Sequence, residues 1–305
     1  MFHLTLRNIS RQKLRYALTT FAVVLGVAFL STSFFLTDRI RDTFDDLAVD
    51  ITGEMDLAVR TSVGDGERIN RLPVPADLVE VVTTDIPGVA AVEPRITAFN
   101  VVPIYLDEEG KATAVTSSGP HLGLNYSGVA GLNQLFIVEG RAPERVGSMH
   151  DPDTIGEFVL DTTTAGANGF SVDGTYTISA RTGNRLFTLV GLLNFGSAEE
   201  NKSVGASITA FDDRTAQEFL GREGLFDQLA LALTAGADEA TVMALIQAEL
   251  DVATARYLSF LDTLPDEQRA ALAPFLETQL EVVTAETLIE EDRADLRLAL
   301  GMLER

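Results

Sequence analysis

Three histidines are the side chains in this sequence best suited to acid–base or metal chemistry, but their surroundings do not support it. His3, His121 and His150 have no G-x-S-x-G segment to provide a serine nucleophile, and the sequence has no cysteine to provide a thiol. After His150, a calcium loop of EF-hand type would need an oxygen ligand where Ile155 stands. No G-x-x-x-x-G-K-[ST] phosphate-binding loop occurs. We therefore expect no catalytic residue, no metal site and no cofactor site in this chain.

Composition excludes further classes of protein. The chain has 305 residues with 23 basic and 45 acidic side chains, which gives a formal net charge of −22. Such a charge repels nucleic-acid phosphates, so we expect no nucleic-acid partner. Zero cysteine rules out a disulfide framework and a zinc ribbon. A hydrophobic content of 46% is too high for a disordered acidic chain and indicates folded structure, a membrane segment, or both.

The basic side chains before residue 17 indicate how the chain is oriented in a membrane. The uncharged stretch ALTTFAVVLGVAFLSTSFFL, residues 17–36, would cover roughly 30 Å as a helix and so predicts a transmembrane span. Four basic residues and no acidic residue precede it: Arg7, Arg11, Lys13 and Arg15. All 45 acidic residues follow it. The positive-inside rule then places the N-terminus in the cytoplasm and the main domain outside. A cleaved signal peptide is a weaker alternative, because no A-x-A-like site precedes Asp38.

Residues 1–16 are predicted to form a basic amphipathic helix. Arg7, Arg11 and Arg15 recur every four residues, opposite an apolar side. This pattern suits contact with an anionic inner leaflet or with a cytoplasmic partner, and it suits equally the positive flank of any span.

The span is predicted to continue outside the membrane as a stalk helix over residues 37–54. Ile40, Phe44 and Leu47 keep one apolar face among charged neighbours until Gly53. We therefore expect these three residues to take part in the mechanics of the stalk.

The remaining sequence predicts an α+β fold in which one layer is split by an insertion. Residues 55–106 and 225–284 each show a strand, helix, strand pattern, and together they predict a porter-like α+β subdomain. Residues 107–224 alternate β-branched runs with turn signals and predict an inserted, mainly antiparallel β-rich subdomain.

Finer boundaries within these subdomains follow from hydrophobic periodicity. Residues 96–106 are predicted to form a single strand, and residues 252–279 a helical hairpin that turns near Pro265. Residues 285–305 predict a last helix, with Leu296, Leu300 and Leu303 on one face.

Two passages resemble the FtsX-like, macrolide-exporter-type (MacB-like) permeases of ABC transporters, in the part that carries the extracytoplasmic core domain. The first is LTLRNISRQKLRYALTTFAVVLGVAFL, a basic amphipathic helix that leads into a span with a glycine near its middle. The second is LFIVEGRAPERVG with the later GEFVLDTTTAGANGFSVDGTYTIS and LFTLVGLLNFGS. These passages look like the family's sequence of Gly-Arg-x-Pro, a Gly-Glu strand, an Ala-x-x-x-Gly helix turn, a Val-x-Gly-type turn and a strand ending in Val-x-Gly, which reads Leu-Val-Gly here.

This resemblance implies a bacterial inner-membrane permease whose large outer domain lies between the first and second spans. The partners it implies are a cytoplasmic ABC ATPase subunit, a second permease copy or paralogue, and membrane lipid. ATP and Mg²⁺ would be bound by that ATPase, whose motion would pass through the stalk to the outer domain. We expect the chain to be the N-terminal portion of such a permease, with residues 285–305 returning toward a missing second span.

Two other functions fit part of the pattern. A single-span anchored binding protein, sensor or adaptor would also combine one span with a soluble domain. An anchored hydrolase that uses His121 or His150 is a third reading, weakened by the missing nucleophile motifs.

Overall fold

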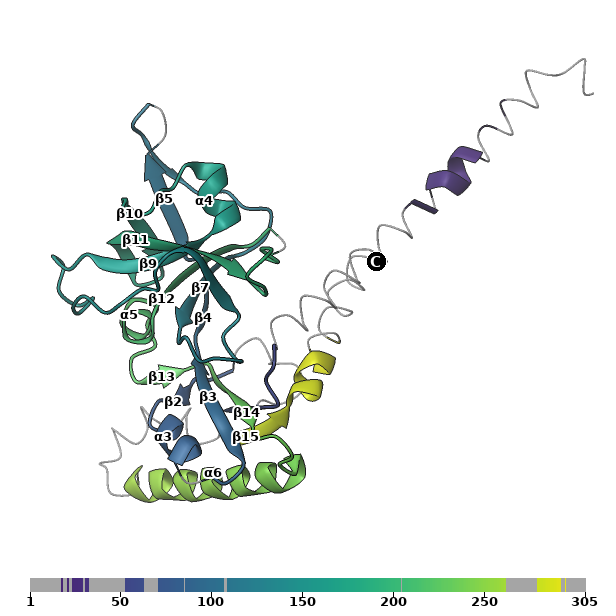
Figure 1. The fold of residues 1–305 in the computed structure, drawn as a ribbon, viewed down its shortest axis with the longest axis vertical. Coiled ribbons are helices and arrows are strands. Elements are labelled where there is room, and N and C mark those ends of the chain that lie inside the picture. Colours follow the sequence, from purple (N-terminus) through teal and green to yellow (C-terminus); the bar gives the residue numbers. More distant parts are fainter. Residues whose placement is uncertain are drawn as a thin grey trace, which may run out of the picture.

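The computed structural model describes most of the outer domain and only isolated residues of the predicted span (Figure 1). Described are residues 18, 21, 24–29, 31–32, 53–62, 71–84, 86–106, 109–203, 205–261, 279–291 and 294. Six residues singled out for membrane or stalk contacts lie outside these ranges: Arg7, Arg11, Arg15, Ile40, Phe44 and Leu47. Among the described residues, no helix combines the length and the apolar character that crossing a membrane requires.

A four-stranded sheet forms the lower lobe in Figure 1. Its strands, in spatial order, are β15 (Leu280–Thr284), β1 (Leu57–Thr61), β14 (Gln228–Leu233) and β3 (Val89–Arg95). All neighbours are antiparallel. Two helices complete the layer: α3 (Leu78–Thr84) between β1 and β3, and α6 (Glu239–Leu261) between β14 and β15. The two strand-helix-strand units therefore interlock as a split βαβ arrangement, although more than a hundred residues separate them in sequence.

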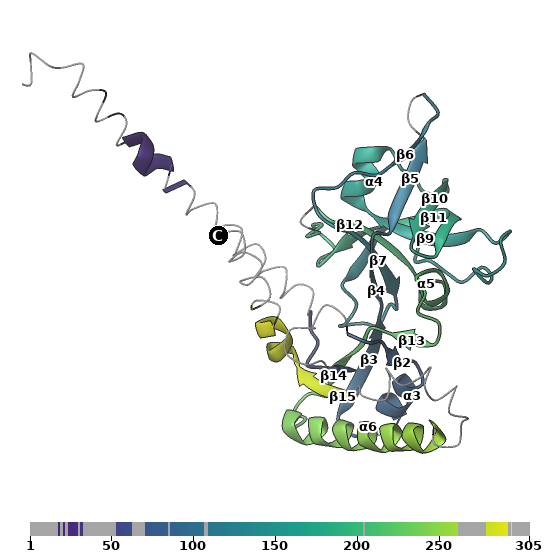
Figure 2. The same ribbon diagram turned by 180° about the vertical axis from the view of Figure 1, so that it is seen from behind.

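The two faces of this sheet pack against different parts of the chain. Leu57 and Val59 of β1 belong to the core cluster that contains α3 and α6 side chains, and both helices lie on one face (Figures 1 and 2). Ala58 points to the opposite face, where it packs with Leu132 and with Leu288 of the helical segment 285–291. This alternation is the period of two expected for a strand that is buried on both sides.

A nine-stranded sheet forms the other lobe and is built from the middle of the chain. Along it lie β4 (Thr97–Phe99), β7 (His121–Tyr126), β12 (Ser207–Asp212), β9 (Gly156–Asp161), β11 (Gly183–Phe195), β10 (Thr175–Ala180), β5 (Val102–Leu106) and β6 (Ala112–Ala114), with β8 (Leu135–Gly140) on β11. Only the β11–β9 and β12–β7 pairs are parallel among the pairs described in this sheet. Helices α4 (Thr162–Asn168) and α5 (Asp213–Phe219) follow β9 and β12, and β13 (Leu225–Phe226) pairs with β2 (Val74–Pro75).

Aromatic side chains fill the centre of the upper lobe. The ring centroid of Phe187 lies 4.9 Å from those of Phe211 and Phe219 and 6.3 Å from that of Phe158. These rings belong to the same buried cluster as Leu57 of the lower lobe. One continuous core therefore joins the two sheets.

The strand predicted over residues 96–106 is two strands. Asn100 stands between β4 and β5 with φ of +62°, a left-handed conformation that asparagine tolerates and that turns the chain. Both strands pair within the nine-stranded sheet. The chain therefore passes from the four-stranded sheet to the nine-stranded sheet at Ile96, and not after residue 106 as predicted. The sequence shows no turn signal at Ile96 because that residue is buried in the shared core, at 1% exposure.

The helix of the second strand-helix-strand unit, α6, continues without interruption to Leu261, so residues 252–261, the first part of the predicted hairpin, are helical. The remainder of the predicted hairpin, residues 262–278, lies outside the described residues. The last predicted helix begins at Ala285, after Thr284, whose hydroxyl Oγ1 accepts a hydrogen bond from the backbone N–H of Thr287 at 3.1 Å.

The glycine that opens the Gly-Glu strand is required by core packing. A Cβ at Gly156 would lie 2.5 Å from ring carbon Cε1 of Phe187. We expect Gly156→Ala to lower the free energy of unfolding by about 2 kcal/mol, since inserting a methyl into a filled core displaces its neighbours. Urea-induced unfolding measures the change.

Gly166 in α4 provides the matched control. A Cβ there meets nothing within 4 Å, and alanine favours a helix over glycine by roughly 0.5–1 kcal/mol. Gly166→Ala should therefore be neutral or slightly stabilising. Equal losses from the two substitutions would contradict the packing explanation.

Candidate functional site

The chain enters the four-stranded sheet at the start of β1 and leaves it at the end of β15, and these two points lie side by side. Leu57 at the start of β1 pairs with Thr284 at the end of β15, and the N–H of Ala285 donates to the backbone oxygen of Asp56 at 2.9 Å. The Asp56 carboxylate Oδ2 accepts the N–H of Leu233, the last residue of β14, at 2.6 Å. The segments before β1 and after β15 are thus tied to each other and to the sheet centre. We call this junction, formed by residues 56–61 and 280–291, the joint.

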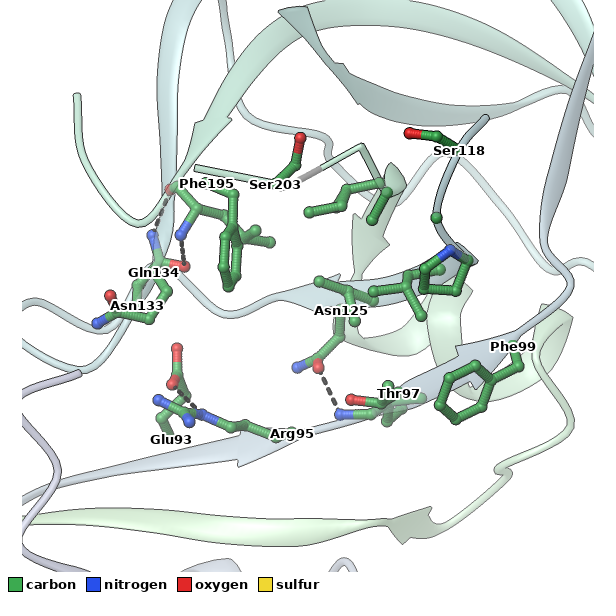
Figure 3. Close-up of a pocket in the computed structure, with 18 residues that line it drawn as sticks. Glu93, Arg95, Thr97, Phe99, Ser118, Asn125, Asn133, Gln134, Phe195 and Ser203 are labelled. Atoms are coloured by element: carbon green, nitrogen blue, oxygen red, sulfur yellow. Dashed lines mark hydrogen bonds and ion pairs between the residues drawn. The ribbon is translucent and has the colours of Figure 1, made fainter. Parts of the chain in front are cut away.

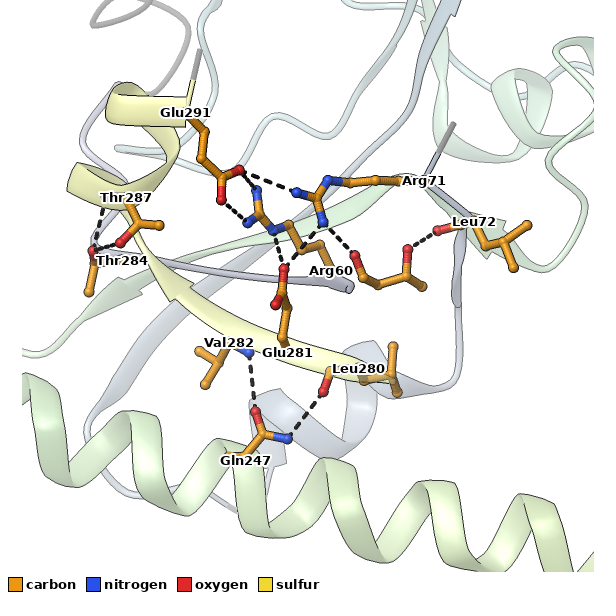
Figure 4. Close-up of polar contacts among 11 residues, drawn as sticks. Arg60, Arg71, Leu72, Gln247, Leu280, Glu281, Val282, Thr284, Thr287 and Glu291 are labelled. Atoms are coloured by element: carbon orange, nitrogen blue, oxygen red, sulfur yellow. Dashed lines mark hydrogen bonds and ion pairs between the residues drawn. The ribbon is translucent and has the colours of Figure 1, made fainter. Parts of the chain in front are cut away.

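A buried ion cluster crosses the joint (Figure 4). Arg60 stands opposite Glu281 in the β1–β15 register, and its Nε lies 2.8 Å from Glu281 Oε1. The same guanidinium holds Glu291 of the following helical segment with two bonds, of 2.8 and 2.9 Å. The Arg60 side chain is only 5% exposed. One buried cation therefore fastens the helical segment 285–291 to both strands.

Arg71 closes the cluster from a separate segment. Its Nη1 donates to the backbone oxygen of Thr61 at 2.7 Å, and its guanidinium lies 3.2 Å from each of Glu281 and Glu291. Two arginines and two glutamates therefore balance in charge. Planar arginine forks suit this shared arrangement better than lysine would.

Burial and pairing act in opposite directions on the two arginines. Burial lowers the pKa of Arg60, but hydrogen bonds and charge from Glu291 and Glu281 outweigh it and leave that pKa raised. The pKa of Arg71 is lowered, first by burial and then by the charge of Arg60. Both guanidiniums stay protonated, because arginine titrates far above neutral pH. Arg60 is therefore the better paired of the two cations.

A second set of polar contacts fixes the two lobes to each other where the chain crosses from β3 to β4. Asn125 of β7 accepts the Ile96 N–H at 2.6 Å through Oδ1 and donates through Nδ2 to the Pro94 oxygen and to Asp213, both at 2.7 Å. Both the oxygen and the NH2 group of the Asn125 side chain are therefore hydrogen-bonded. Asn125 is 8% exposed, so these bonds are shielded from water.

The other crossing, from β13 to β14, is fastened to the first by Asp227. Its Oδ2 accepts the Thr97 N–H at 2.7 Å, and its own N–H donates to the Arg95 oxygen at 2.8 Å. Arg222 Nε pairs with Asp227 Oδ1 at 2.8 Å. The two crossings are therefore held together and the lobes connect through a stiff waist, made of residues 93–97, 125 and 227.

A pocket of about 440 Å³ lies beside this waist (Figure 3). Its walls come from the β3–β4 crossing, from β7 and β12, from segments 118–120 and 133–135, and from Ser203 and Ala206. The lining is mostly apolar, with the Glu93–Arg95 ion pair at one end.

The histidines do not form a hydrolytic site in the part of the chain that the structure describes. His121 Nε2 lies 3.3 Å from Ser117 Oγ, but that hydroxyl donates to the Gly119 oxygen, and buried His121 Nδ1 has no partner. His150 pairs with the exposed Glu223. No group of three or more acidic or histidine side chains in the described ranges is placed to hold a metal ion.

His121 makes the stability of the protein depend on pH. Burial lowers the pKa of His121 below its ordinary value of 6.5. The folded state then binds fewer protons than the unfolded state, so stability falls as pH drops from about 6.5 through the lowered pKa, by at most ~1.4 kcal/mol per pH unit. His121→Gln should remove this slope. Urea midpoints of both proteins between pH 7.5 and 5 test it, and parallel pH profiles would contradict it.

The motifs on which the family resemblance depended turn out to be structural. Arg141 of Gly-Arg-x-Pro forms a two-bonded ion pair with Glu157 of the Gly-Glu strand, with Nη1 2.6 Å from Oε2. Gly140 adopts φ of +72° where it crosses Gly191. Gly169 ends α4 at φ of +70°. These residues shape the nine-stranded sheet.

Sequence analysis missed the residues that the structure brings together at the joint and the waist. Strands were expected within residues 55–106 and 225–284, and β1 and β15 each carry one charged residue beside apolar ones, Arg60 and Glu281. Opposite charges in two neighbouring buried strands were the available signal. Asn125 had no such signal, because its partners are mostly backbone groups.

A known family model matches most of the chain. The family model described as MacB-like periplasmic core domain matches residues 16–249. Among solved structures, the periplasmic region of MacB from Actinobacillus actinomycetemcomitans is 11% identical with a TM-score of 0.47, over 78% of this chain and 92% of that one. The extracellular domain of the noncanonic ABC-type transporter YknZ from Gram-positive bacteria is 12% identical with a TM-score of 0.39, over 61% and 88%. No curated protein matches the sequence.

Proposed function

This chain belongs to the family of the MacB-like periplasmic core domain, so it carries the extracytoplasmic domain of an ABC transporter permease, and we propose that this domain receives ATP-driven motion through the joint. The motion would act on a substrate or an accessory protein outside the membrane, for export or extraction. The role is mechanical and non-enzymatic in this chain.

The arrangement of the joint is the observation that supports this proposal most directly. The two chain connections are hydrogen-bonded neighbours, through Leu57 opposite Thr284 and Ala285 N–H to Asp56. A relative movement of the two flanking segments would therefore load the β1–β15 pair first. Arg60 would pass this load into the sheet, since it binds the helical segment and both strands.

The waist supports the second step of the proposal, in which motion passes from the lower lobe to the upper lobe. Asn125 and Asp227 hold the two lobes together across both chain crossings. A displacement that enters the lower lobe would reach the upper lobe with little loss. The domain would then move as one lever, with its outer end in the nine-stranded sheet.

The membrane anchor and the partners belong to the same proposal. The apolar residues 17–36 would form the first span, with Arg7, Arg11 and Arg15 at the cytoplasmic surface and the stalk over residues 37–54 outside. A cytoplasmic ABC ATPase would bind the ATP and Mg²⁺, and a second permease copy or paralogue would complete the transporter. The sequence pattern and the family match, which begins at Tyr16, support this assignment.

Hydrogen exchange on the assembled transporter tests the proposal. The full chain is purified from membranes and its amide exchange is compared in ADP and in ATP with vanadate, which traps an ABC ATPase. We expect an ABC ATPase to co-purify, and exchange within residues 56–61 and 280–291 to change between the two states. Residues 156–161 in the central strand β9 are the internal control and should stay protected.

Two outcomes would overturn the proposal. The first is a preparation that retains no ATPase under conditions that preserve membrane complexes. The second is identical exchange at the joint in both nucleotide states. Either outcome would favour the alternative of a single-span binding protein or adaptor.

A further inference from the structure

The pocket beside the waist has the features of a small-molecule site. Its floor is one face of three neighbouring strands, on which Phe99 of β4, Leu122 of β7 and Ile208 of β12 stand in register. The volume of about 440 Å³ lies within the range of ligand pockets in proteins. An unfilled apolar recess of this size is unfavourable in water, so a ligand that fills it gains affinity from burial.

The two ends of the pocket differ in polarity (Figure 3). Glu93, Arg95 and Gln134 gather at one end, and Phe99 lies at the other. Arg95 Nε donates to Glu93 Oε2 at 2.7 Å, and Ser127 donates to the other Glu93 oxygen. The pair is charge-balanced and presents polar groups without a net charge. The apolar end is open, because the Phe99 side chain is 64% exposed.

From this geometry we propose that the pocket binds an amphiphile with a linear aliphatic chain and an uncharged polar head. Arg95 and Phe99 are four positions apart along the chain, about 13 Å at ~3.3 Å per residue of extended backbone, which suits a medium-length chain and not a compact ring system. The head would lie at the Glu93–Arg95 end and the chain would lie along Leu122 and Ile208. An uncharged head is favoured over a charged one, because Glu93 and Arg95 already neutralise each other.

The sequence makes a direct test possible, because it contains no tryptophan. Phe99→Trp places a single fluorophore at the open end, where high exposure allows the larger ring. Leu106→Trp on β5 is the matched control, since Leu106 is 71% exposed and does not line the pocket. Both variants of the full chain are titrated with 11-bromo-1-undecanol, whose bromine quenches tryptophan only at close range. Saturable quenching is expected for Phe99→Trp, and only weak, linear quenching for Leu106→Trp.

A third variant shows whether the probe enters the pocket. Ala206→Leu, made in the Phe99→Trp background, fills the recess at a wall residue that is 9% exposed. It should weaken saturable quenching at least tenfold. Should that variant fail to fold, Ser118→Phe at the exposed rim provides the same obstruction.

Three results would overturn the proposal. One is parallel quenching of Phe99→Trp and Leu106→Trp, and another is a quenching curve that neither obstruction changes. The third is an emission shift of Phe99→Trp on transporter assembly together with no response to the bromo-alcohol, which would make the pocket a protein contact. The quenching measurements need neither nucleotide nor an ATPase, so their failure would leave the mechanical proposal untouched.

Discussion

Replacing Arg60 by methionine is expected to lower the free energy of unfolding by about 3 kcal/mol, the low end of the range for breaking a buried ion pair. Methionine keeps most of the side-chain volume but leaves Glu281 and Glu291 with one arginine, Arg71, in place of two. Their side chains are 33% and 23% exposed, so water screens part of the loss. Urea-induced unfolding of the full chain measures the change.

Two further variants separate the electrostatic cause from lost packing. Arg71→Met should cost clearly less, because Arg71 contacts the same carboxylates at 3.2 Å and Arg60 would still pair them. Adding only Glu281→Gln to Arg60→Met should recover a large part of the stability, since Arg71 and Glu291 then balance in charge. A double variant as unstable as Arg60→Met alone would refute the electrostatic account.

Local patterns in the sequence were sufficient to predict the split lower layer. Residues 225–284 were expected to end in a strand, which is β15, and the two strand-helix-strand units interlock in one sheet as predicted. A mixed α+β fold and the family resemblance are confirmed. Hydrophobic periodicity failed to predict that residues 96–106 form two strands. Asn100 separates them by adopting a positive φ, which a hydrophobic pattern does not encode.

The sites could not be predicted in the same way because their members are distant in sequence. Arg60 is separated from Glu281 by 221 positions and from Glu291 by 231. Only the order of strands in the sheet brings them together, and that order follows from the packing of the whole layer. The pocket was missed for a similar reason, because it is a space left between segments and not a motif within one.

Asn125→Ala is expected to be the most damaging change at the waist, at about 3 kcal/mol. Alanine would leave the Ile96 N–H, the Pro94 oxygen and the Asp213 carboxylate without this partner, and each buried unsatisfied polar group costs about 1–3 kcal/mol. We also expect the single urea transition to broaden or to separate into two, because the lobes lose a principal connection.

Asn133 is the matched control, since its amide bonds only within its own loop in the described contacts, to the Leu135 oxygen at 2.7 Å and from the Leu135 N–H at 3.2 Å. Asn133→Ala should cost about 1 kcal/mol, as expected for local hydrogen bonds at a partly buried site, and should leave the transition sharp. Equal losses of unfolding free energy for Asn125→Ala and Asn133→Ala would show that the hydrogen bonds at the waist stabilise the protein no more than those within a loop.

Asn125→Asp tests the same contact through pH. The pKa of Asp213 is already raised, mainly by burial, which the hydrogen bond from Asn125 partly offsets, and further by the charges of Asp212 and Glu93. A carboxylate at position 125 would face Asp213 across a contact of 2.7 Å, and the pKa values of the pair would rise together. A carboxyl group with a raised folded pKa destabilises the protein above that pKa and not below its unfolded value of about 3.8. Asn125→Asp should therefore be less stable than Asn125→Ala at pH 7 and recover relative to it as the pH falls toward 4. A constant difference between the two variants across this range would mean that Asp213 does not sense the charge at position 125.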